Sequence, residues 1–144
     1  MSLRIFYDNT KLRLNNWKRT SEIISKIIGK ENSIIGNINI IITTDKEVRE
    51  INVQFLEHDY NTDVITFNYN KKKRINGEIY ISIDTVKINS VNYNVSLRSE
   101  VLRVMIHGVL HLLGYNDTSE EQKREMRAME DMWLEKSKII WNEL

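Results

Sequence analysis

The spacing of apolar and polar residues predicts four strands and five helices along the chain. Short stretches that are rich in β-branched residues, or that alternate between apolar and polar residues, lie at 3–7, 38–44, 63–69 and 77–83. Both patterns are typical of strands. Segments with apolar residues at helical spacing begin near residues 16, 45, 84, 97 and 118. The predicted order is βαβαββααα, with the last two strands paired as a hairpin. We expect an α+β fold, a small mixed sheet of about four strands packed with helices, as a single domain over residues 1–144.

Apolar stripes predict which side of several elements faces inward. In the second helix the stripe is formed by Val48, Ile51 and Phe55. In the last helix it is formed by Met126, Met129, Met132 and Trp133. In the last strand, Ile79 and Ile81 should face one side of the sheet, and Glu78 and Tyr80 the other.

The helix predicted for 97–113 is apolar nearly all round. Such a helix is typically buried, so we expect it at the centre of the fold. Its polar residues fall on one stripe, formed by Glu100, Arg103, His107 and His111. Residues four apart on a helix have Cβ atoms about 5–6 Å from each other, so both imidazoles can reach one metal ion. A metal would also satisfy two polar groups that burial otherwise leaves unpaired.

Gly114 and Asp117 complete the candidate metal site. A glycine directly after a helix permits a left-handed turn, which brings the following residues back toward the helix. Asp117 then becomes the third ligand, in the pattern His-x3-His-x5-Asp. Alternatively, Asp117 caps the last helix, and Asn116 or a water completes the metal site. A third interpretation is that the two histidines only form hydrogen bonds within the core.

Charge and composition limit the chemistry. The chain has 144 residues, a formal net charge of +1 and no cysteine. A metal must therefore be held by histidines and carboxylates, and such a site accepts zinc or other divalent transition metals, with one ion per chain. A net charge near zero still allows a local basic patch. The chain lacks an apolar signal core and any run near the roughly 20 apolar residues of a membrane span, so the expected location is the cytoplasm.

The two histidines and the glycine turn also resemble the metzincin peptidase pattern H-E-x-x-H-x-x-G-x-x-H. Gly108, however, stands where that pattern has the glutamate that acts as general base. A peptidase of that kind is therefore not expected. Gly108 itself either allows tight helix packing or leaves space for substrate next to the two histidines.

Three blocks of the chain resemble the YbeY family, bacterial endoribonucleases of ribosomal RNA maturation. HGVLHLLGYND (107–117) is similar to the family's H-G-x-L-H-L-x-G-Y-D-H, NTDVITF (61–67) to T-D-V-L-S-F, and GEIYIS (77–82) to G-D-I-x-I-S. The resemblance implies a zinc-dependent, single-strand-specific endoribonuclease that acts in ribosomal RNA maturation and ribosome quality control. It further implies ribosomal RNA or its precursor as substrate, and small-subunit ribosomal proteins as further partners.

The chain departs from the family pattern at two positions. The family's third zinc ligand is a histidine, and here Asp117 stands in its place. Asp is also a good zinc ligand, so we expect the site to survive with altered charge. Leu56 stands where the family tends to carry an arginine, whereas Asp59 matches the end of the same segment. The resemblance implies three protein ligands and an open fourth position for water, as in catalytic zinc sites.

Several charged residues are candidates for catalysis and RNA binding. The candidates for a general base are the carboxylates of the family-like blocks, Asp59, Asp63 and Glu78. The candidates for contact with RNA phosphates are Arg103, Lys71, Lys72, Lys73 and Arg74. Arg103 can instead pair with Glu100 or Asp63, and the basic run can be a solvated hairpin turn.

Two other functions are compatible with the same motif. A metal-dependent hydrolase of a peptide or small molecule predicts a deep pocket without basic surface near the metal. A ribosome assembly factor with a mainly structural zinc predicts a closed coordination shell and no cleavage.

Overall fold

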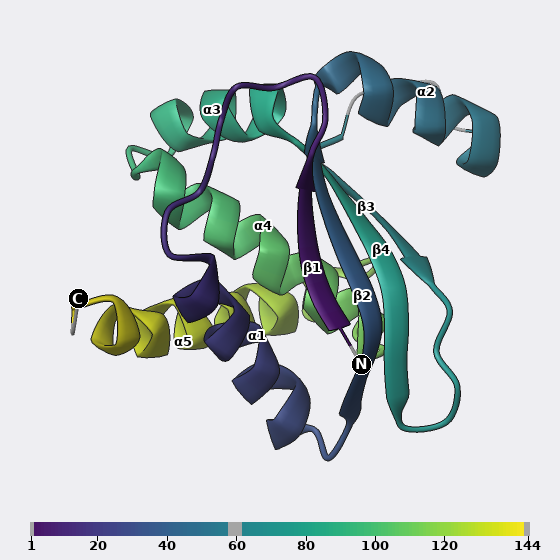
Figure 1. Ribbon diagram of the computed structural model, residues 1–144, viewed down its shortest axis with the longest axis vertical. Coiled ribbons are helices and arrows are strands. Elements are labelled where there is room, and N and C mark those ends of the chain that lie inside the picture. Colours follow the sequence, from purple (N-terminus) through teal and green to yellow (C-terminus); the bar gives the residue numbers. More distant parts are fainter. Residues whose placement is uncertain (1, 58–61, 143–144) are drawn as a thin grey trace.

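The elements follow one another in the order βαβαββααα that the sequence predicts. The computed structural model describes residues 2–57 and 62–142, the last four of these by their backbone alone. The elements are β1 (Ser2–Tyr7), α1 (Trp17–Lys30), β2 (Ile34–Thr43), α2 (Asp45–Leu56), β3 (Val64–Asn68), β4 (Arg74–Ser82), α3 (Ile83–Asn92), α4 (Leu97–Leu112) and α5 (Glu120–Asn142). Figure 1 shows the sheet with α1, α4 and α5 gathered on one side of it.

The four strands form one mixed sheet in the order β1-β2-β4-β3. β1, β2 and β4 are parallel, and β3 lies at an edge, antiparallel to β4. The predicted α+β class, with a mixed four-stranded sheet and a β3–β4 hairpin, is therefore confirmed. Among the described residues, no helix has the length and hydropathy needed to cross a bilayer.

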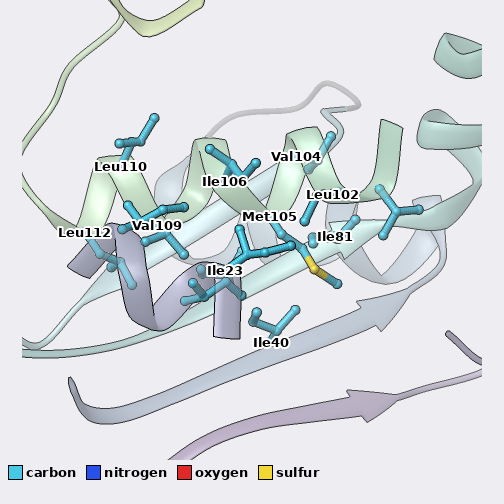
Figure 2. Close-up of a cluster of buried hydrophobic side chains, with 14 of the residues drawn as sticks. Ile23, Ile40, Ile81, Leu102, Val104, Met105, Ile106, Val109, Leu110 and Leu112 are labelled. Carbon is cyan, nitrogen blue, oxygen red and sulfur yellow. The ribbon is translucent and has the colours of Figure 1, made fainter. Parts of the chain in front are cut away.

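Helix α4 forms the centre of the hydrophobic core, as its all-round apolar character predicts. Figure 2 shows its side chains above Ile40 and Ile81 of the sheet, with Ile23 of α1 among them. A Cβ atom added to Gly108 would lie 2.8 Å from Cγ2 of Ile79. The glycine therefore lets α4 pack closely against β4, which supports the packing interpretation of this residue.

Helix α2 lies on the opposite face of the sheet from α4. Ile79 faces α4, so by strand alternation Glu78 and Tyr80 face the other side. Phe67 pairs with Glu78 and packs against Phe55 of α2, with ring centroids 5.9 Å apart. The predicted burial of Phe55 is nevertheless wrong, because α2 covers only one end of this face and leaves the ring 61% exposed.

The inward stripe of α5 differs from the prediction at one position. Met126 and Trp133 are buried and Met129 is half-buried, whereas Met132 is 38% exposed. Glu130 is buried instead, on the same side of α5 as Met126 and Trp133. This side of α5 faces the polar stripe of α4, so it includes a carboxylate as well as apolar side chains.

Candidate metal centre

The two histidines of α4 and the aspartate after it meet at one point. His107 and His111 lie one helical turn apart, and their Nε2 atoms are 3.0 Å from each other. Gly114 has a φ of 103°, and the Tyr115 N–H donates to the Leu110 carbonyl, so the chain folds back over the end of the helix. Asp117 Oδ2 then lies 3.3 Å from Nε2 of both histidines.

This triangle of donor atoms fits a metal ion. Tetrahedral zinc with bonds of about 2.0–2.1 Å requires ligand atoms about 3.3 Å apart, close to the 3.0–3.3 Å observed. Within the described part of the chain, these residues form the one group of three or more acidic, histidine or cysteine side chains with this proximity. The group can therefore bind a metal ion.

The alternative role of Asp117, as a cap of the last helix, is not what the structure shows. Ser119 Oγ accepts a hydrogen bond from the Gln122 N–H, and Gln122 Oε1 accepts from the Ser119 N–H. This reciprocal pair is a capping box. Ser119 thus caps α5 and leaves Asp117 available as a ligand.

Glu130 orients His107 from the neighbouring helix. Its Oε2 lies 2.7 Å from His107 Nδ1, and because an ionised carboxylate only accepts, Nδ1 must be the donor. This hydrogen bond leaves the lone pair of Nε2 free to face a metal. Arg103 in turn donates to Glu130 at 2.9 Å and to Asp131 at 2.6 Å. The predicted partners of Arg103 were Glu100 or Asp63, and the hydrogen-bonded partners are instead these two carboxylates of α5.

Burial and charge shift several pKa values around the cluster. Burial lowers the pKa of His107, but the hydrogen bond and charge of Glu130, together with the charge of Asp117, outweigh burial and raise it above 6.5. Burial raises the pKa of Asp63 above its ordinary 3.8, although the charge of His107 opposes this shift. Burial likewise raises the pKa of Glu100, against the opposing charge of Arg103.

Two clefts open at the cluster. The first, of about 350 Å³, is lined by mostly polar residues, among them His107, Asp117, Lys123 and Arg127. The second, of about 360 Å³, lies at the edge of β3 and is lined by residues that include all three cluster members and Leu56. The cluster therefore sits where a substrate can approach from either of two sides.

The structure separates the three candidates for a general base. Asp63 lines both clefts, beside His107 and Asp117. Glu78 is not brought to the cluster: it lies on the opposite face of the sheet and accepts hydrogen bonds from Tyr69 and Tyr80. Asp59 lies outside the described residues.

The candidates for RNA contact also fall in different places. Arg103 lines the first cleft, but its guanidinium is held by the carboxylates of α5. Lys71, Lys72 and Lys73 belong to the exposed turn between β3 and β4, Arg74 is the exposed first residue of β4, and none of the four lines either cleft. The two basic residues of the first cleft that sequence reasoning missed are Lys123 and Arg127.

Glu130 is the other residue that sequence reasoning missed, although one signal pointed to it. A charged residue within an apolar stripe, four positions after Met126 and three before Trp133, is rarely buried without a partner. Its partner could not be named from the sequence, because His107 lies 23 residues away on another helix.

We expect Glu130→Gln to weaken metal binding by about 10–100-fold, because the candidate ligand His107 loses the charge that orients its ring and raises its basicity. The measurement is the metal dissociation constant by competition with a chelator. Asp131→Asn is the matched control, since Asp131 also accepts from Arg103 but belongs to the exposed end of that interaction. Equal affinities for Glu130→Gln and the unmodified protein would contradict the orienting role.

The fold and the cluster together define an α+β protein in which a buried helix presents two histidines, and a glycine turn returns a carboxylate, to a site able to hold a metal ion. The model of a family described as Endoribonuclease YbeY matches residues 5–138. The chain is 42% identical to an endoribonuclease YbeY of Chlorobaculum tepidum, over 93% of this chain and 96% of the relative. It is 40% identical to that of Amoebophilus asiaticus, over 94% of this chain and 92% of the relative.

A solved structure has a similar fold. The solution structure of a protein from Thermotoga maritima matches with a TM-score of 0.68 and 28% identity, over 99% of this chain and 93% of that one. The chain belongs to the YbeY family. By that membership it is an endoribonuclease, an enzyme of the hydrolase class that acts on RNA.

Proposed function

We propose that this protein is a zinc-dependent endoribonuclease that cuts single-stranded RNA beside His107, His111 and Asp117. The observation that carries the proposal is the triangle of three ligand atoms, 3.0–3.3 Å apart, where two clefts meet. Precursor ribosomal RNA as the substrate, a role in ribosome quality control, small-subunit ribosomal proteins as partners and a cytoplasmic location belong to the same proposal and rest on family membership.

The chain's own residues would hold a metal and leave it accessible. His107 and His111 would donate through Nε2 and Asp117 through Oδ2, while Glu130 fixes the ring of His107. When bound at such a site, a divalent metal acidifies a water and stabilises negative charge on a phosphoryl oxygen. Three protein ligands beside open clefts support a catalytic rather than a structural role.

Asp63 is the carboxylate placed to accept the proton of the attacking water. It lines both clefts, so it faces the space next to the ligands whichever way the RNA enters. Burial raises its pKa, and a pKa closer to the working pH suits a group that takes up and releases a proton. We therefore assign general-base catalysis to Asp63 within the proposal.

The first cleft supplies groups that suit an unpaired nucleotide. Lys123 and Arg127 can hold phosphate oxygens, and Asn89 and Tyr93 offer an amide and an aromatic ring. Its volume of about 350 Å³ is in the range of small-molecule sites, which suits a single nucleotide. Acidic residues also line this cleft, so the cleft is not a broad basic surface. Lys123 and Arg127 instead act as local contacts for phosphate.

The proposal is tested by metal removal. Purified protein should contain about one zinc per chain and cleave single-stranded RNA. A chelator should abolish cleavage, and added zinc should restore it. Cleavage should also fall steeply with salt, because phosphate contacts release counterions. Metal-loaded protein that leaves RNA intact would overturn the proposal in favour of an assembly factor with structural zinc. Cleavage of peptides instead would favour a hydrolase of another class.

A further inference from the structure

The face of the sheet opposite α4 carries an unusual set of side chains. Strand register places Phe6, Ile41, Tyr80 and Ile65 in one row across the four strands. The next row consists of Arg4, Asn39, Glu78 and Phe67. We call these two rows, with Phe55, Tyr69 and the hairpin residues 71–74, the open face.

The described structure covers this face only in part: Ile65 is buried, whereas Arg4 and Phe6 are exposed. Helices α1, α4 and α5 pack on the other side of the sheet, and α2 lies over one end (Figure 1). The exposed fractions are 46% for Phe6, 61% for Phe55 and 56% for Tyr69. Phe6 lies on one edge strand and Tyr69 follows the other, with the half-buried rings of Tyr80 and Phe67 between them. Exposed apolar surface that extends over one face is typical of a binding site.

The rings are held in place before any ligand arrives. Phe67 meets Phe55 and Tyr80 edge to face, each at a centroid distance of 5.9 Å. Tyr69 and Tyr80 both donate to the carboxylate of Glu78, at 3.2 and 3.4 Å. A surface whose rings are already ordered loses little entropy on binding a flat ligand.

Positive charge lies at the same face. Arg4 is exposed in the second row, and the four cations of the turn at 71–74 are exposed where the hairpin ends. Glu78, the one carboxylate in the two rows, is half-buried and shared between two hydroxyls. Aromatic rings beside cations match the two components of single-stranded nucleic acid, the bases and the phosphates.

The open face is continuous with the metal centre around the edge of the sheet. The second cleft is lined by Ile65 and Thr66 of the edge strand, by Leu56, and by His111 among the ligands. The residue after Thr66 is Phe67, which belongs to the open face. An RNA strand that leaves the second cleft therefore reaches Phe67 by passing around the edge strand β3.

We infer that the open face is a second binding surface of the enzyme, on which single-stranded RNA next to the cut segment stacks its bases while the hairpin cations hold its phosphates. This inference rests on the proposed function. In this inference the basic residues 71–74 bind RNA at the open face and not in either cleft. A strand several nucleotides long can then be held at two points, whereas a very short one reaches the metal centre alone.

The experiment compares two RNA lengths. KM and kcat are measured on a 20-nucleotide single strand and on a 4-nucleotide strand, with the double variants Phe6→Ser/Tyr69→Ser and Lys71→Glu/Lys73→Glu. Because base–aromatic stacking contributes about 1–3 kcal/mol per base, the first variant should raise KM for the long strand roughly tenfold or more. The second should raise it too, and should flatten its salt dependence. KM for the short strand and both kcat values should stay unchanged.

Matched controls remove similar groups elsewhere. Ile88→Ser takes an exposed apolar side chain from α3, and Lys26→Glu reverses an exposed charge on α1. Both should leave the ratio of the two KM values as it is. If the unmodified protein cleaves neither strand, the proposed function itself fails. If it cleaves both and the open-face variants behave like the controls, only this inference fails. A change in oligomeric mass without a change in KM would make the face a protein contact and would also overturn it.

Discussion

Asp117→Ala should yield a protein that purifies without its metal and does not cleave RNA. In the proposed site its side chain provides one of three ligand atoms, each within 3.3 Å of the others. Two imidazoles alone leave the metal with too few protein ligands to compete with water and chelators. The loss should exceed the roughly 10–100-fold that follows removal of an outer hydrogen-bond partner. Metal content by elemental analysis and the rate of RNA cleavage are the two measurements.

Two companion variants make this result specific. Asn116→Ala, at the exposed neighbouring position, should retain metal and activity. Asp117→His should retain the metal with one more unit of positive charge at the centre, which favours loss of a proton from the attacking water. Its pH–rate profile should therefore move to lower pH. Stoichiometric zinc in Asp117→Ala would show that Asp117 is not a ligand.

Asp63→Asn should lower kcat by about 10²–10⁴-fold while the metal stays bound, because a positioned general base contributes on that order. The amide keeps the size of the side chain but cannot accept a proton. A base works only when ionised, so the rate of the unmodified enzyme should rise with pH through the pKa of Asp63, which burial places above 3.8. In Asp63→Asn this acidic limb of the profile should disappear.

Glu100→Gln is the matched control for Asp63. Glu100 lines the first cleft and its pKa is also raised by burial, but it does not line the second cleft with the three ligands. Its replacement should leave the acidic limb in place. Asp63→Asn with full kcat and full metal content would remove Asp63 from the mechanism.

The element order, the central position of α4 and the candidate ligand motif all follow from local sequence patterns. These features are local: an all-round apolar helix must be buried, residues four apart share a face, and a glycine after a helix allows the left-handed turn. His107, His111 and Asp117 lie within eleven consecutive positions, so helix geometry and one turn bring them together. The family-like blocks extended this reading to an endoribonuclease, which the relatives confirm.

Which other residues reach the cluster depends on how the helices and strands pack together. Glu130 meets His107 because α5 packs across α4, and no spacing rule links residues 23 apart on two helices. Asp63 reaches the clefts because β3 is the edge strand beside α4. Glu78, an equal candidate by motif, faces away, because the packing of Gly108 against Ile79 sets which side of β4 meets α4. The periodicity of the sequence determines which residues share a face of one helix or strand. Contacts between elements depend instead on which of their faces pack together.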